Sequence, residues 1–178
     1  MNLTDVLAQA SSATTLRKVT GYIGNDPKRF AELVRLFLAG PYRLTQRAAG
    51  PLLRCVQSKP QLVLPHLRTF LKQLAQPGQH DSIKRNVLRL LQHIEIPIRL
   101  QGVTADTAFR LLADRSEPVA IRVFAMTVSA NLAKHQPALA NELCLLIEDE
   151  LPYGTAAFVS RGTKTLKLLR SARGAARK

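Results

Sequence analysis

The 178-residue chain contains no tryptophan, only two cysteines and few acidic side chains. It also lacks any apolar run approaching the roughly 18 residues that a membrane-spanning helix needs, so we expect no membrane span. Cys55 and Cys144 stand apart in apolar stretches, and neither has another cysteine or a histidine at metal-ligand spacing. This pattern predicts buried, inert thiols that form no disulfide.

The features of a secreted protein and of an enzyme are missing as well. Residues 1–13 have neither the basic start nor the apolar centre of a signal peptide, so we expect a cytoplasmic protein. The histidines are isolated, and no glycine-rich phosphate loop, metal-spaced cluster or nucleophile motif occurs. We therefore expect no catalytic activity, no cofactor and no small-molecule substrate.

Positive charge, in contrast, is abundant. The chain has 26 lysines and arginines against 12 acids, a formal net charge of +14. Between residues 42 and 93 there are nine lysines and arginines, and Asp81 is the one acid. The acids gather late in the chain, at 142–150. Such asymmetry produces a positive field over the first two-thirds of the chain and indicates an anionic partner.

A repeat organises the sequence. Prolines recur at Pro27, Pro60, Pro97 and Pro137. Bases recur about 38 residues apart, each early in the second of two apolar helical patterns, at Arg47, Lys84, Arg122 and Arg161. A helix pair repeated at this period indicates a stacked α-solenoid. No segment shows sustained two-residue alternation, and we expect no β-sheet.

The predicted fold is an all-α, right-handed α-solenoid of about four helix pairs with an N-terminal helical cap. We place the cap at 1–24, the repeats at about 25–59, 60–96, 97–136 and 137–171, and a basic tail at 172–178.

Local signals refine the helix boundaries. Asp26 followed by Pro27 is a helix start, because aspartate caps free amides and proline suits the first helical position. Pro51 and Pro65 are expected to kink, bend or interrupt their helices, since proline lacks a backbone donor. Thr104 is expected to cap the first helix of the third repeat.

The repeated unit resembles the HEAT-repeat family, whose second helix often carries a valine-arginine pair after an aspartate in the turn. Two sites match the pair and two keep only its base: Ile83-Lys84, Ile121-Arg122, Gln46-Arg47 and Ser160-Arg161. Asp81 and Glu117 are the nearest candidates for the acid in the turn. The resemblance covers residues 25–171 and implies a helical solenoid that presents a binding surface.

One branch of this family, the alkylpurine DNA glycosylases, cradles DNA on the concave face and uses an aromatic cleft with an essential carboxylate. This chain has no tryptophan and few acids on its expected second helices. The resemblance therefore does not extend to glycosylase activity.

The bases have two interpretations. The four periodic bases either form a ladder that meets a ligand or bridge to acids and carbonyls of neighbouring repeats, and few matching acids are visible in the sequence. The additional bases Arg43, Arg54, Arg85 and Arg89 are harder to explain structurally, because like charges one turn apart repel. The lysines and arginines after residue 160 are either a solvated helix face and tail or an arm that contacts phosphates.

We therefore predict a non-catalytic module that holds nucleic acid by its phosphates on a basic concave face. The candidate contact residues are Arg43, Arg47, Arg54, Lys84, Arg85, Arg89, Arg122 and Arg161. The competing hypothesis is a HEAT-repeat scaffold that docks an acidic protein segment, and a third is a nucleic-acid-processing enzyme. Few aromatic residues are free of the apolar stripes, so contacts to the phosphate backbone would dominate and sequence specificity would be low.

Overall fold

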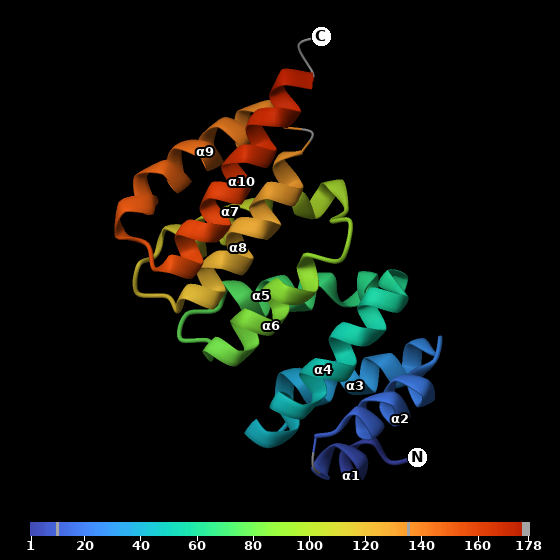
Figure 1. Ribbon diagram of the computed structural model, residues 1–178. Helices are drawn as coiled ribbons and strands as arrows, with labels where there is room; N and C mark the ends of the chain where they lie inside the picture. Colours follow the sequence, from blue (N-terminus) through green and yellow to red (C-terminus); the bar gives the residue numbers. More distant parts are fainter. Residues whose placement is uncertain (10, 135, 176–178) are drawn as a thin grey trace. The chain divides into compact units, whose positions relative to one another are not determined.

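The computed structural model describes residues 1–9, 11–134 and 136–175, with side chains through Ser171. Over these residues the chain is helical and contains no strand (Figure 1). The helices divide into two compact units, unit 1 (Met1–Gln73) and unit 2 (Leu74–Lys178), and the boundary falls within the repeat expected at 60–96. None of the helices in the described ranges is long and apolar enough to cross a membrane.

Unit 1 is built around one long helix. Its elements are α1 (Leu3–Ala8), α2 (Ala13–Ile23), α3 (Pro27–Ala39), α4 (Tyr42–Ser58), the 3-10 segment η1 (Pro60–His66) and most of α5 (Leu67–Ala75). Helix α4 packs against α1, α2, α3 and η1, so its apolar stripe is enclosed on several sides.

Both the start of α3 and its packing follow from local chemistry. The Asp26 side chain accepts hydrogen bonds from the backbone amides of Lys28 (2.8 Å) and Arg29 (3.2 Å), and Pro27 opens the helix. Further along α3, Phe37 is fully buried, and its ring centre lies 6.2 Å from that of Phe70 on α5. This aromatic pair anchors the core of unit 1.

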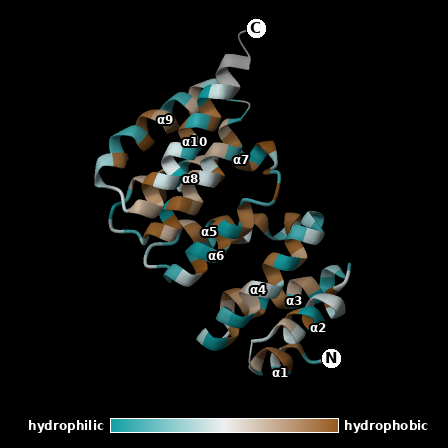
Figure 2. Cartoon of the chain, in the orientation of Figure 1, coloured by the Kyte–Doolittle hydropathy of each residue, from teal (hydrophilic) through white to brown (hydrophobic). Residues whose placement is uncertain are grey.

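Unit 2 consists of two layers of helices. Its elements are α6 (Asp81–Leu91), α7 (Ile98–Ala113), α8 (Val119–Ala133), α9 (Pro137–Glu150), the 3-10 turn η2 (Leu151–Tyr153) and α10 (Ala156–Ala175). Helix α8 lies between α6 and α10 in one layer, and α7 and α9 pack behind it in the other (Figure 1). Hydrophobic residues concentrate where these helices face one another (Figure 2).

Two prolines and one threonine bear on the helix boundaries in different ways: an interruption occurs at Pro65 and not at Pro51, and Thr104 begins no helix. Pro51 is buried inside α4 and does not interrupt it, because packing on several sides outweighs the lost hydrogen bond. Pro65 lies in η1, and α5 begins only after it, at Leu67. Thr104 is not a cap, because α7 already begins at Ile98; its hydroxyl donates to the Leu100 carbonyl within the helix (2.7 Å).

The predicted basic tail at 172–178 lies outside the described side chains.

The cap of α3 provides a test of the local argument. We expect Asp26→Ala to lower the free energy of unfolding by about 1 kcal/mol, since two amides of the first turn lose their acceptor. Asp26→Asn keeps a capping oxygen and loses only the exposed ion pair with Arg29, and it should cost about 0.5 kcal/mol or less. Urea unfolding followed by circular dichroism measures both values. Equal losses in the two variants would contradict the role of the cap.

Candidate functional site

The four periodic bases all contact groups within their own unit. In unit 1, Arg47 extends from α4 to the end of α1. Its Nη1 donates to the carbonyl of Leu7 (3.2 Å) and to that of Ala8. The last carbonyls of a helix have no partner within the helix, and a guanidinium satisfies them well. Arg47 therefore joins α1 to α4.

In unit 2, Lys84 on α6 reaches the turn before α8. Its Nζ donates to both carboxylate oxygens of Glu117, at 2.6 and 2.7 Å, and lies 3.1 Å from Asp81. Burial acts to lower the pKa of Lys84, but the hydrogen bonds to Glu117 and Asp81 outweigh it, so the pKa is raised. The ammonium group is thus held inside the unit.

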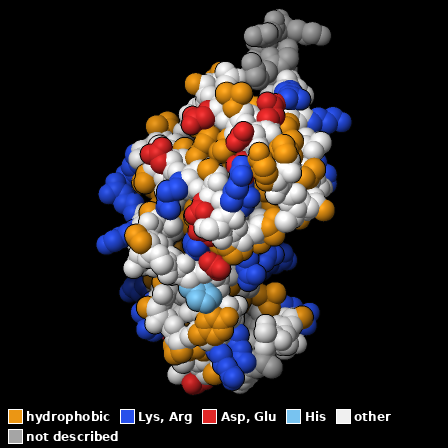
Figure 3. All heavy atoms as spheres, turned by 90° about the vertical axis from the view of Figure 1, so that its left-hand side faces the viewer, with side chains coloured by type: hydrophobic (Ala, Val, Ile, Leu, Met, Phe, Trp, Pro, Cys, Tyr) orange, Lys and Arg blue, Asp and Glu red, His pale blue; other side chains and the backbone are white. Residues whose placement is uncertain are grey.

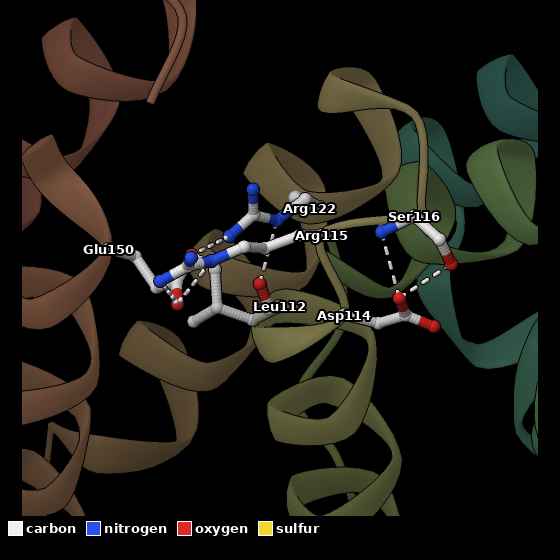
Figure 4. Close-up of polar contacts among 6 residues, drawn as sticks. All are labelled: Leu112, Asp114, Arg115, Ser116, Arg122 and Glu150. Carbon is white, nitrogen blue, oxygen red and sulfur yellow. Dashed lines mark hydrogen bonds and ion pairs between the residues drawn. The ribbon is translucent and has the colours of Figure 1, made fainter. Parts of the chain in front are cut away.

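Arg122 on α8 is the most enclosed of the four, with 7% of its surface exposed. Its Nη2 donates to Glu150 at 2.7 Å, and its Nε donates to the Leu112 carbonyl at 2.8 Å (Figure 4). The guanidinium also lies over the ring of Phe158, 4.5 Å from its centre.

A second guanidinium completes this cluster. Arg115 donates to both oxygens of Glu150 at 3.0–3.1 Å and lies 3.9 Å from the centre of the Tyr153 ring. The bonds from Arg115, and then those from Arg122, hold the pKa of Glu150 below its ordinary value although burial opposes them. One buried carboxylate thus ties the turn after α7 to α8 and to the end of α9.

Arg161 on α10 completes the periodic set. Its Nη1 donates to the Thr127 hydroxyl on α8 at 3.3 Å, and the side chain is half-buried. These contacts favour the structural interpretation for all four periodic bases. For Arg122 in particular, burial against Glu150 does not fit contact with an external phosphate.

Sequence reasoning missed the acids that serve this ladder. Glu117 and Glu150 follow their bases by 33 and 28 positions, at the turn before α8 and at the end of α9. The resemblance indicates Glu117 only as a candidate acid in the turn between the two helices of its own repeat, not as the partner of Lys84. The sequence signal that could have identified Glu117 as the partner of Lys84 is its position 33 residues later, nearly one repeat along the chain.

The other four candidate bases lie on exposed surfaces. Arg43 and Arg54 are 11 positions apart on α4, and Arg85 and Arg89 are one turn apart on α6, so each pair lies along one side of its helix. Within the described part of the chain, no hydrogen bond or ion pair links these four guanidinium groups to another residue. Of the eight candidate bases, these four remain available to an external anion.

Charge is also divided between the layers of unit 2. Helices α6, α8 and α10 carry one acid, Asp81, in their described ranges, and α10 adds the exposed Lys164 and Lys167. A group of exposed acids lies instead on α9, at Glu142, Glu148 and Asp149. Figure 3 shows acidic side chains on the part of the surface that α9 covers.

Comparison with known proteins identifies a family for this chain. The sequence model described as a HEAT repeat domain matches residues 3–166. No curated protein and no solved structure matches the chain.

Removing one member of the buried cluster tests its role. We expect Arg122→Leu to lower the free energy of unfolding by about 3 kcal/mol, because Glu150 stays buried and loses its enclosed partner. Arg115→Ala removes a guanidinium that is 51% exposed and should cost about 1 kcal/mol or less. Chemical denaturation measures both variants, and equal losses would contradict the role assigned to burial.

Acidification should reveal the same cluster. Because the folded-state pKa of Glu150 lies below the ordinary 4.5, the carboxylate stabilises the fold above that pH, and the stabilisation is lost as pH falls through the lower, folded-state pKa. Glu150→Gln removes this dependence. The difference in Tm between wild type and variant should be largest near neutral pH and shrink below pH 4.5. A difference that stays constant across this range would contradict the assignment.

Proposed function

Because the chain belongs to the HEAT-repeat family, a family of helical scaffolds, we propose that it is a non-catalytic binding module that holds nucleic acid by its phosphates. The observation that carries this proposal is the division between two sets of bases. The periodic bases are engaged within the fold, whereas Arg43, Arg54, Arg85 and Arg89 are exposed and have no partner in the described chain.

Unpartnered like charges favour an anionic ligand. Arg85 and Arg89 lie one turn apart, where they repel each other by a few tenths of a kcal/mol, about what a favourable i,i+4 pair contributes. No acid on α8 or α10 compensates them in the described residues. A phosphate backbone would relieve this repulsion, and guanidinium groups match phosphate geometry well.

The burial of the aromatic residues indicates which part of a nucleic acid the protein would contact. Phe30, Phe37, Phe70 and Phe158 are fully buried and cannot stack on bases. Affinity would therefore come from the backbone, with little dependence on sequence and a steep dependence on salt.

A competing protein-scaffold function uses the same surfaces. The family match supports a scaffold for interactions in general, and exposed guanidinium groups would also pair with an acidic protein segment. Tyr42, which is 62% exposed beside Arg43, is the type of residue enriched in protein interfaces. Direct binding measurements separate the two functions.

Fluorescence anisotropy with labelled random-sequence duplex DNA and single-stranded RNA tests the proposal. We expect wild-type binding in the micromolar range at about 50 mM salt, and weakening by tenfold or more at about 200 mM. The charge reversals Arg43→Glu with Arg54→Glu, and Arg85→Glu with Arg89→Glu, should each weaken binding at least tenfold.

The matched control reverses the same amount of charge on α7. Arg99→Glu with Arg110→Glu changes two exposed bases on the other layer of unit 2 and should weaken binding much less. If the control weakens binding as much as the test variants do, the loss of affinity reflects the net charge of the protein and not the proposed contact residues. Absence of wild-type binding at low salt, together with binding of a polyglutamate peptide, would establish the protein-scaffold function instead.

A further inference from the structure

Unit 1 contains a hollow of about 370 Å³ between α2 and α4. Its cationic side chains are Arg17 from α2 and Arg54 and Lys59 from α4 and the residue that follows it. None of the residues that line it is acidic. Arg17 and Lys59 carry no periodic signal and were not among the sequence candidates.

The three cations line one hollow that has no acidic lining residue. Over the residues that the structure describes, no ion pair or hydrogen bond joins the guanidinium groups of Arg17 and Arg54 or the ammonium group of Lys59 to another residue. A concave site lined by one sign of charge concentrates the electric field and attracts the opposite charge. Three cations around one hollow repel one another, and a bound phosphate would attract all three.

Neighbouring groups suit the same ligand. The Ser58 hydroxyl lines the hollow and can donate to an anion. Burial raises the pKa of the Cys55 thiol to about 11, against a smaller opposing effect of Lys59, so this lining group stays neutral at physiological pH. The residues that line the hollow therefore contribute no negative charge that would oppose a phosphate.

Gly21, which lines the hollow, leaves space for a larger side chain. A Cβ atom built at Gly21, in α2, would meet no atom within 4 Å. The position thus faces empty space, and a larger side chain there would fill the hollow without changing its charge. Helix α2 should tolerate the change, because most residues suit a helix interior better than glycine does.

A hollow of unit 2 has a less selective lining. It measures about 540 Å³ and is lined by Glu95 as well as Lys134, with several amide side chains. Mixed charge of this kind favours no one sign of ligand, in contrast to the hollow of unit 1.

We propose that the hollow between α2 and α4 seats one phosphate of the nucleic acid strand, held by Arg17, Arg54 and Lys59. The inference rests on the proposed function, since Arg54 also belongs to the exposed set on α4. Two guanidinium groups supply directed hydrogen bonds and the ammonium supplies a point charge. The site fixes where the strand crosses unit 1.

Two kinds of variant test this site. Arg17→Ala with Lys59→Ala removes charge, and Gly21→Leu fills the space. Each should weaken binding of a labelled 12-nucleotide single strand about three- to tenfold at about 100 mM salt, since both remove one phosphate contact. Because one phosphate is lost, the slope of log affinity against log salt should fall by about 1 in each case.

The control, Lys18→Ala with Lys28→Ala, removes the same charge from exposed positions of α2 and α3 that do not line the hollow. It should leave affinity within about twofold of wild type, the change that loss of non-contacting surface charge produces. If the hollow variants bind as tightly as this control, the site is wrong. Circular dichroism confirms that each variant is folded.

Inorganic phosphate separates failure of the site from failure of the proposed function. In the wild type, phosphate should shift the backbone amide signals of Gly21 and Gly24, which line the hollow, and in Arg17→Ala with Lys59→Ala it should not. These shifts without any oligonucleotide binding would overturn the nucleic-acid function and leave a site for another phosphate. Oligonucleotide binding without the shifts would overturn the site and leave the function.

A comparison of strand ends identifies which phosphate the site holds. Equal affinity for 5′-phosphorylated and unphosphorylated strands indicates an internal phosphate, and preference for the phosphorylated strand indicates a terminal one.

Discussion

A base buried in a stack of helices must meet an acid or a carbonyl, because an unpaired charge in the interior is very costly. In unit 2 this constraint is met by the pairs Lys84–Glu117 and Arg122–Glu150, each of which joins a second helix to the repeat that follows. The same residues fix the turn before α8 and the end of α9. The periodic base is thus primarily a connection between repeats, and its regular spacing reflects the regular stacking of the helices.

The proposed function depends on the bases that take no part in this connection. Acids pair with two of the periodic bases, Lys84 and Arg122, whereas Arg47 and Arg161 contact uncharged oxygens, and most of the excess charge of the chain lies on other, exposed positions. In unit 2, Arg85 and Arg89 lie close to Lys84 on α6 and form no ion pair with a described residue, and in unit 1 three cations line the hollow between α2 and α4. Each unit therefore has its own proposed contact site for an anion, and neither proposal depends on how the two units are arranged.

The helical architecture could be predicted from the sequence because capping residues and apolar periodicity act locally: Asp26 and Pro27 set the start of α3 as expected. The family match confirms the HEAT resemblance. Pro51 could not be judged locally, since the packing that tolerates it comes from distant residues. The ladder acids vary in spacing from their bases, which concealed them. The proposed phosphate site depends on the packing of α2 against α4, and periodicity along the chain does not indicate that Arg17 and Arg54 line the same hollow.

Two adjacent residues of α6 test the division between structural and binding bases most directly. The measurement is the free energy of unfolding of Lys84→Ala and of Arg85→Ala. Lys84 is held by Glu117 at 2.6 Å, and its loss should cost about 2 kcal/mol because a largely buried carboxylate is left unpaired. Arg85 is exposed, and its loss should change stability by less than about 0.5 kcal/mol. Equal effects, or a larger loss at Arg85, would contradict the division on which the functional proposal rests.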